Sequence, residues 1–362
     1  MEKRSGQDLQ ETPLVSVCLP AYNAEETLAK TLDSILAQDY KNLEIIVCDN
    51  HSTDQTAKIA KAYAKLGVRY LLSPDSVAKE PLCPGESNWN YILGQATGPY
   101  LALYHADDLY APDMVRKQVE FLQHNPTVSS VFTMTQMIDE LDRPIRRGST
   151  SLPDEYKDKS TFNFAELFNA SLKYGNIIIT PTLMTRKETL TSVGDFNYRE
   201  FFTAADLALW LRMSQWRPIG IINEPLHKYR VSANKTSSLA NKSRSNIAHY
   251  FLVMDYYLNK EKTKRLVQKG ALNTYTTYKC SDQVFCAVNL IMKGKMSEAK
   301  KVLDKALKWD ALHPLSSKPR HFLQIIYGWL LKATFLLGLE NTMGRLGHLV
   351  YTDYRAKKTK PL

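Results

Sequence analysis

The chain has 362 residues, of which 44% are hydrophobic and 23% are charged. This composition is ordinary for a globular protein, so it excludes a largely disordered chain, and the length predicts about two domains. The five cysteines lack the spacing of a zinc site, which favours a reduced, cytosolic protein. The first residues include no apolar stretch of the kind that directs secretion.

The formal charge of +10 is unevenly distributed along the chain. Residues 1–240 hold 25 Lys or Arg and 29 Asp or Glu, whereas residues 241–362 hold 22 and 8. A basic module attached to a mildly acidic one predicts that the C-terminal part meets an anionic surface, either lipid headgroups or nucleic acid.

Short apolar runs rich in β-branched residues alternate with helical patterns as far as residue 240. The predicted strands cover residues 14–23, 43–48, 68–72, 100–104, 128–134, 176–186 and 219–231. Helical spacing follows most of these runs, which predicts a parallel α/β sheet with a nucleotide-sized crevice at its carboxyl edge. We expect this domain to cover residues 14–240, after a flexible segment 1–13, with 139–160 as a surface loop or a mobile lid.

Two adjacent carboxylates, Asp107 and Asp108, follow the apolar strand 100–104 and precede a helix that begins near Pro112. Paired carboxylates at a strand end can bind a divalent cation that in turn coordinates a phosphate. The alternative is that the two aspartates only cap the following helix. The chain has neither a GxGxxG fingerprint after its first strand nor a GxxxxGK[ST] loop, so neither type of glycine-rich loop holds the phosphates. A bound metal would then be the simplest way to neutralise a diphosphate.

From about residue 245 the pattern is helical only, with basic outer faces. The most apolar segment, 322–339, fits either a helix lying in the plane of a membrane or an ordinary core helix of this region. The neighbouring basic residues, including the run Arg355 to Lys360, favour an anionic membrane surface as a partner. No RNA-binding motif is present, so nucleic acid is the weaker alternative.

Three stretches in this order resemble a known family: SVCLPAYNAEETLAKTLDSILAQDYKNLEIIVCDNHSTDQT, then HADD, then AADLALWLR. They are similar to a family 2 glycosyltransferase of the GT-A fold, over roughly residues 14–238. The resemblance implies a mostly parallel central sheet flanked by helices, with a basic, all-helical extension at residues 241–362. It also implies an inverting enzyme that uses a nucleotide-diphosphate sugar and a divalent metal, Mn²⁺ or Mg²⁺.

The resemblance assigns roles to particular residues of this chain. It makes Asp108 the principal metal ligand and Asp206 the general base that deprotonates the acceptor hydroxyl. The residues that it places around the nucleotide sugar are Pro20, Ala21, Tyr22, Asp49, Asp107 and Arg230.

This chain departs from the family pattern at several positions. His105 replaces the frequent first acid of the metal motif, Ala205 replaces the glutamate before the base, and Asn50 stands where many members have a second aspartate. Because Asp49, Asp108 and Asp206 are all present, we expect an active hexosyl- or deoxyhexosyltransferase at the cytoplasmic membrane face. Its expected product is a cell-surface polysaccharide or lipid-linked glycan. The alternative is an inactive protein of this fold that binds nucleic acid or an anionic surface through its basic tail.

Overall fold

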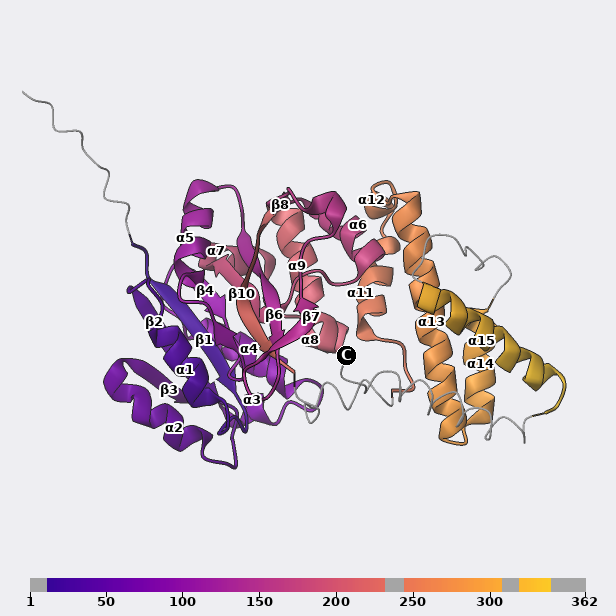
Figure 1. Cartoon of the computed structure of the whole chain (residues 1–362), viewed down its shortest axis with the longest axis horizontal. Coiled ribbons are helices and arrows are strands. Elements are labelled where there is room, and N and C mark those ends of the chain that lie inside the picture. Colours follow the sequence, from indigo (N-terminus) through magenta and orange to yellow (C-terminus); the bar gives the residue numbers. More distant parts are fainter. Residues whose placement is uncertain (1–11, 232–243, 308–318, 340–362) are drawn as a thin grey trace, which may run out of the picture. The chain divides into compact units, whose positions relative to one another are not determined.

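A computed structural model describes residues 12–231, 244–307 and 319–339 of the chain (Figure 1). The predicted N-terminal segment 1–13 and the basic run Arg355 to Lys360 therefore lie largely or wholly outside the described residues. The chain forms two compact units, one of Met1–Phe164 and Ile178–Arg230, the other of Ala165–Ile177 and Val231–Leu362. Each unit is described by itself below.

The first unit contains a single sheet of 10 strands in the order β3-β2-β1-β4-β9-β6-β10-β5, with β7 paired to β6 and β8 to β10. The strands are β1 Val15–Ala21, β2 Leu43–Asp49, β3 Val68–Leu72, β4 Tyr100–Leu103, β5 Leu109–Tyr110, β6 Ser130–Ile138, β7 Pro144–Ser149, β8 Thr161–Phe162, β9 Leu183–Arg186 and β10 Ile219–Arg230. Neighbouring strands are parallel from β3 through β4, and so are β6 and β10, whereas β9 is antiparallel to both β4 and β6.

This arrangement confirms the predicted α/β fold with a mostly parallel central sheet. The buried, β-branched character of β1 and β2 explains their central position, because a parallel strand is covered on both faces. The predicted strand 176–186 is shorter in the structure, where Thr180–Thr182 form a 3-10 turn before β9 begins. Pro181 has no backbone N–H to donate to a neighbouring strand, which accounts for the difference.

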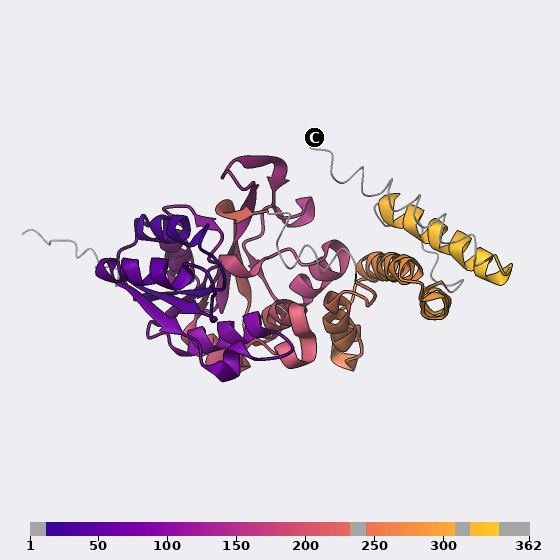
Figure 2. The same ribbon diagram turned by 90° about the horizontal axis from the view of Figure 1, so that it is seen from below.

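Helices cover both faces of the sheet, as Figure 2 shows for the first unit. Side chains of α1, α2 and α5 pack with one set of alternating strand residues, including Val17, Val47 and Ala102. Helix α4 lies on the opposite face, where its Ile92 carbonyl meets the Cys18 thiol of β1. The helices of this unit are α1 Leu28–Leu36, α2 Thr56–Ala62, α3 Asp75–Ala78, α4 Pro84–Gly94, α5 Met114–His124, α7 Lys187–Val193, α8 Tyr198–Phe201 and α9 Ala205–Trp216, with short 3-10 helices at Tyr63–Leu66, Asp154–Tyr156, Thr180–Thr182 and Phe202–Ala204.

The described part of the second unit is helical. Its helices are α11 His249–Leu258, α12 Glu261–Lys264, α13 Lys269–Met292, α14 Met296–Ala306 and α15 Pro319–Leu336, joined by all but the first residue of α6 Phe164–Tyr174. Helices α13, α14 and α15 share a separate apolar core (Figure 1). Among the described residues, no helix combines the length and the apolar character needed to cross a membrane.

Candidate active site at the carboxyl edge of the sheet

Strands β1, β2 and β4 end at the same edge of the sheet, because they are parallel neighbours. A cavity of about 290 Å³ opens there. It is lined by Pro20, Ala21, Tyr22, Asn23, Ala24, Thr27, Asn50, Gly85, Asn88, Trp89, His105, Ala106 and Asp107. The structure thus brings four predicted site residues, Pro20, Ala21, Tyr22 and Asp107, around one cavity, whereas Asp49, Asp108, Asp206 and Arg230 are not among its lining residues.

Asp49 lies beside this cavity as the last residue of β2. Its carboxylate is buried and accepts hydrogen bonds from the Ser52 backbone N–H, at 2.9 Å, and from the Tyr70 hydroxyl, at 3.1 Å. These bonds fix the loop that follows β2, and the next residue, Asn50, lines the cavity. Contact between Asp49 and a nucleotide base stays a prediction.

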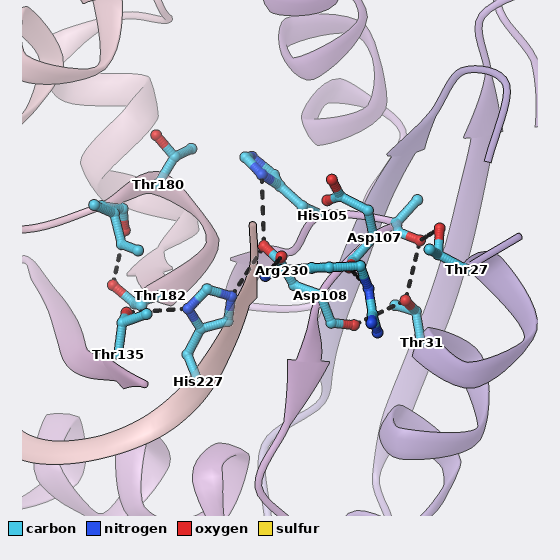
Figure 3. Close-up of polar contacts among 12 residues, drawn as sticks. Thr27, Thr31, His105, Asp107, Asp108, Thr135, Thr180, Thr182, His227 and Arg230 are labelled. Carbon is cyan, nitrogen blue, oxygen red and sulfur yellow. Dashed lines mark hydrogen bonds and ion pairs between the residues drawn. The ribbon is translucent and has the colours of Figure 1, made fainter. Parts of the chain in front are cut away.

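The turn His105–Ala106–Asp107–Asp108 follows β4 and is held by helix α1. The Thr27 and Thr31 hydroxyls each donate to the Ala106 carbonyl at 3.0 Å, and Thr31 also reaches the Asp108 carbonyl at 2.8 Å (Figure 3). On the other side, the Tyr110 hydroxyl accepts from the His105 backbone N–H at 2.7 Å. Since the backbone is bonded from both sides, the directions of the acidic side chains are set by the turn itself.

Asp108 is fully buried, and both of its carboxylate oxygens are bonded to strand β10. The Arg230 backbone N–H donates to Oδ1 at 2.9 Å, and His227 Nε2 lies 3.0 Å from Oδ2. His227 is also fully buried, and its Nδ1 lies 3.0 Å from the Thr135 hydroxyl of β6 (Figure 3). Because a carboxylate only accepts, His227 donates through Nε2, and a neutral ring then accepts from Thr135 at Nδ1.

His227 and Thr135 are not among the site residues predicted from the sequence. The available signal was a histidine within the predicted strand 219–231, three residues before Arg230. That signal is weak on its own, because the Asp108 partner lies 119 residues away in the chain.

The Arg230 side chain is buried and forms hydrogen bonds that hold the acidic turn in place. Its Nε donates to the Asp107 carbonyl at 3.0 Å, and its Nη1 donates to the Asp139 carbonyl at 3.3 Å and forms an ion pair with Asp142. Nη2 is buried and has no hydrogen-bond partner within the described part of the chain. Contact between Arg230 and a diphosphate stays a prediction.

His105, Asp107 and Asp108 form a group that fits a divalent cation. One potential ligand atom from each residue lies within 4.8 Å of the other two. The His105 ring and the Asp107 carboxylate lie on the same side of the Asp108 carboxylate (Figure 3). Carboxylate oxygens suit Mg²⁺ and Mn²⁺, and an imidazole is compatible with Mn²⁺. His227 provides the hydrogen bond from behind that commonly orients a metal-binding carboxylate.

Asp206 lies in the first turn of α9, outside the cavity wall. Its carboxylate accepts from the Leu207 backbone N–H at 2.6 Å and from the Thr180 hydroxyl at 3.2 Å. Burial raises the pKa of Asp206 above its ordinary value, although these two hydrogen bonds oppose the shift. Burial also raises the pKa of Glu86 on α4, and the Asp206 charge adds to that increase. Glu86 is therefore a second acidic group near Asp206 that the sequence did not single out.

Residues 16–189 match glycosyl transferase family 2. An uncharacterized glycosyltransferase of Haemophilus influenzae is 30% identical over 258 residues, which cover 70% of this chain and 76% of that protein. The fold and the acidic turn define a nucleotide-sugar transferase of the GT-A type. The chain belongs to glycosyl transferase family 2, for which inversion at the sugar carbon is typical.

Two further comparisons bear on the function and the fold. The Escherichia coli UDP-Glc:alpha-D-GlcNAc-diphosphoundecaprenol beta-1,3-glucosyltransferase WfaP is 29% identical over 237 residues, covering 64% of this chain and 84% of that protein. The crystal structure of S. aureus TarS 1-349 in complex with UDP-GlcNAc superposes with a TM-score of 0.54 at 18% identity, covering 90% of this chain and 92% of that one. The second likeness supports the fold alone.

Proposed function

We propose that this protein is an inverting, metal-dependent hexosyltransferase that moves a sugar from a nucleotide-diphosphate donor to an acceptor hydroxyl. The observation that carries the proposal is the acidic turn, which presents His105 and Asp107 in the wall of a cavity at the carboxyl edge of the sheet. Family membership supports the same reaction class.

The cavity provides the contacts that a nucleoside requires. Ala21 and Tyr22 of the β1 end line the cavity, together with Asn50 and Asn88. Tyr22 is 61% exposed, so its ring is available to cover a planar base. The base would then lie near Asp49 and the diphosphate near Asp107.

The diphosphate requires positive charge, which His105, Asp107 and Asp108 would recruit as a divalent cation. A bound Mn²⁺ or Mg²⁺ supplies neutralisation of the negative charge that develops on the diphosphate leaving group. Asp107 and His105 would be the ligands that face the cavity. Asp108 would complete the group from its buried position, oriented by His227.

Asp206 is the group proposed to activate the acceptor. Its carboxylate would take the proton from the acceptor hydroxyl while the acceptor oxygen bonds to the anomeric carbon and the bond to the diphosphate breaks. Attack opposite the leaving group inverts the anomeric centre in one step. The raised pKa of Asp206 makes the carboxylate a stronger base than an exposed aspartate.

The acceptor is proposed to be a sugar on a lipid-linked intermediate of a surface polysaccharide. This part rests on similarity to WfaP, whose name gives a diphosphoundecaprenol-linked sugar as acceptor. The identity of the donor sugar and base is left to experiment.

The test is a panel of nucleotide-diphosphate sugars, measured for binding and for donor hydrolysis with Mn²⁺ or Mg²⁺. Asp107→Asn is expected to weaken metal-dependent donor binding at least about tenfold, because one metal ligand loses its charge. Asp206→Asn should keep donor binding and lose turnover. The exposed Asp158→Asn serves as the matched control and should change neither quantity. Absence of binding to every donor, with and without metal, would refute the proposal.

A further inference from the structure

Helix α15 is apolar on two opposite faces. One face packs into the core of the second unit through Ile325, Leu331 and Phe335, which are at most 5% exposed. At 100° per residue, a second row lies on the opposite side of the helix at residues 323, 326 and 330, and residue 337 continues it one position past the end of α15. This row, the outer stripe, consists of Leu323 (65% exposed), Ile326 (42%), Leu330 (61%) and Leu337 (71%).

The inner face holds α15 on the rest of its unit without help from the outer stripe. Gly328 lies so close to α13 that an added Cβ would meet Val284 Cγ2 at 2.5 Å. The Ser281 hydroxyl of α13 is hydrogen-bonded to both His321 and Gln324 of α15. The sequence left open whether this segment is a core helix or a helix in the plane of a membrane. In the structure, α15 has one face in the core and a second apolar face that is exposed.

The sequence around α15 is strongly basic. Residues 311–339 contain no Asp or Glu, and residues 311–362 hold eight Lys or Arg against two Asp or Glu. Lys332 is directed away from the outer stripe, because its ammonium pairs with Asp304 of α14 at 3.1 Å and donates to the Leu307 carbonyl. Lys332 therefore places no charge in the outer stripe, which lies in a basic part of the sequence.

We propose that α15 docks on an anionic lipid surface, lying in the plane of the membrane with its outer stripe in the boundary between headgroups and acyl chains. A helix of this kind binds through buried apolar area together with attraction of Lys and Arg to anionic headgroups. A second copy of the chain fits less well, since it would bring two basic segments together with no acidic residue in 311–339 to pair them.

The proposal does not depend on which donor or acceptor the first unit uses. The full-length protein is incubated with vesicles of phosphatidylglycerol or of phosphatidylcholine, and the bound fraction is measured by sedimentation. The double variant Ile326→Gln and Leu330→Gln should bind anionic vesicles at least about tenfold more weakly, because two aliphatic side chains no longer enter the lipid. Its melting temperature should stay unchanged, because both side chains are exposed.

The matched control is Leu66→Gln, an equally apolar and 53% exposed position in the first unit, which should bind vesicles as the wild type does. Binding should also fall with added salt and be weak on phosphatidylcholine. Equal vesicle binding by the double variant and the wild type would overturn the proposal. So would a stable wild-type dimer that ignores vesicles and dissociates in the double variant. Donor hydrolysis, assayed without vesicles, should be the same in all these variants.

Discussion

At the scale of single residues, the site depends on which groups hold each carboxylate. Asp107 is in the cavity wall, whereas Asp108 is buried against the His227 ring and the Arg230 backbone. A buried acceptor that loses its donor costs roughly 1–3 kcal/mol, so the Asp108–His227 contact contributes to the stability of the fold. It ties β10 to the turn that carries the candidate metal ligands.

This contact makes His227 a positioning residue whose removal should be measurable. His227→Leu should raise the metal concentration needed for half-maximal donor binding by about 10- to 100-fold, because Asp108 loses its orienting hydrogen bond. His227→Gln, which retains an N–H donor, should recover part of the loss. Metal titration of both variants checks this. Equal metal requirements in His227→Leu and the wild type would show that His227 serves packing only.

The raised pKa of Asp206 predicts opposite effects of pH on activity and on stability. The proposed general base must be ionised to act, so kcat/KM should fall as the pH drops through the raised pKa of Asp206, above the ordinary aspartate range. The folded chain binds this proton more tightly than the unfolded chain, so ionisation lowers stability as the pH rises from the ordinary value through the raised one.

Asp206→Asn should therefore lose turnover at least about a hundredfold while gaining melting temperature at neutral pH relative to the wild type. The gain should vanish below the pKa of an unfolded aspartate, because both chains are then uncharged at this position. Thermal unfolding across this pH range checks the second effect. A variant that is less stable than the wild type at neutral pH would contradict the assigned pKa shift.

At the scale of elements, the long strand β10 decides the shape of the site. It pairs with β6 from Ile219 to Ile222, and its register then shifts on either side of Pro225 before pairing resumes at His227. Proline lacks the N–H needed for continuous pairing, and such irregularities bend a strand. The second half of β10 thereby brings His227 and Arg230 to the acidic turn.

The junction between α4 and β4 offers a test of packing at the edge of the sheet. The Gly98 N–H donates to Ser16 Oγ at 2.8 Å, and an added Cβ would lie 2.6 Å from the Leu14 carbonyl oxygen. Gly98→Ala should lower the free energy of unfolding by about 1–3 kcal/mol, because the contact is with backbone that cannot rotate away. At Gly94 of α4, where a Cβ meets nothing within 4 Å, alanine should be neutral or stabilising by up to about 1 kcal/mol. Urea unfolding of the two variants distinguishes these outcomes, and equal midpoints would refute the prediction.

At the scale of the whole molecule, two separate cores stabilise the two units. The first core is formed by strands with α1, α2 and α5, and the second by α13, α14 and α15. The described residues of the candidate active site all belong to the first unit. A defect in the second core should therefore affect stability before it affects donor binding.

Leu303→Ala is a suitable defect, because this side chain of α14 is fully buried in the second core. It should cost roughly 2–5 kcal/mol of that unit's stability through the cavity it leaves. Donor affinity at a temperature below the transition should match the wild type, as checked by titration calorimetry beside thermal unfolding. Leu122→Ala in the first core is the comparison, and it should lower the stability of the first unit rather than that of the second. A parallel fall in donor affinity for Leu303→Ala would show that the units are coupled.

The sequence by itself determined the order of the main strands and helices, the position of the acidic turn and the presence of a basic helical region. These features follow from local patterns: alternating burial, helical spacing, a proline after the turn and the distribution of charge. The sequence did not indicate the strands β5, β7 and β8, of which β7 lies within the predicted loop 139–160. The family resemblance assigned Pro20, Ala21, Tyr22 and Asp107 to one site, and they line one cavity because the carboxyl ends of parallel strands meet at one edge.

Only the tertiary structure decided which partner each polar group takes. The Asp108–His227 contact joins residues 119 apart, the grouping of Ala165–Ile177 with the second unit joins distant segments, and the outer stripe of α15 is exposed because its opposite face is packed. Local patterns constrain a residue's face and conformation. They do not contain the distance between segments that meet only when the chain has folded, which is why these contacts could not be read from the sequence.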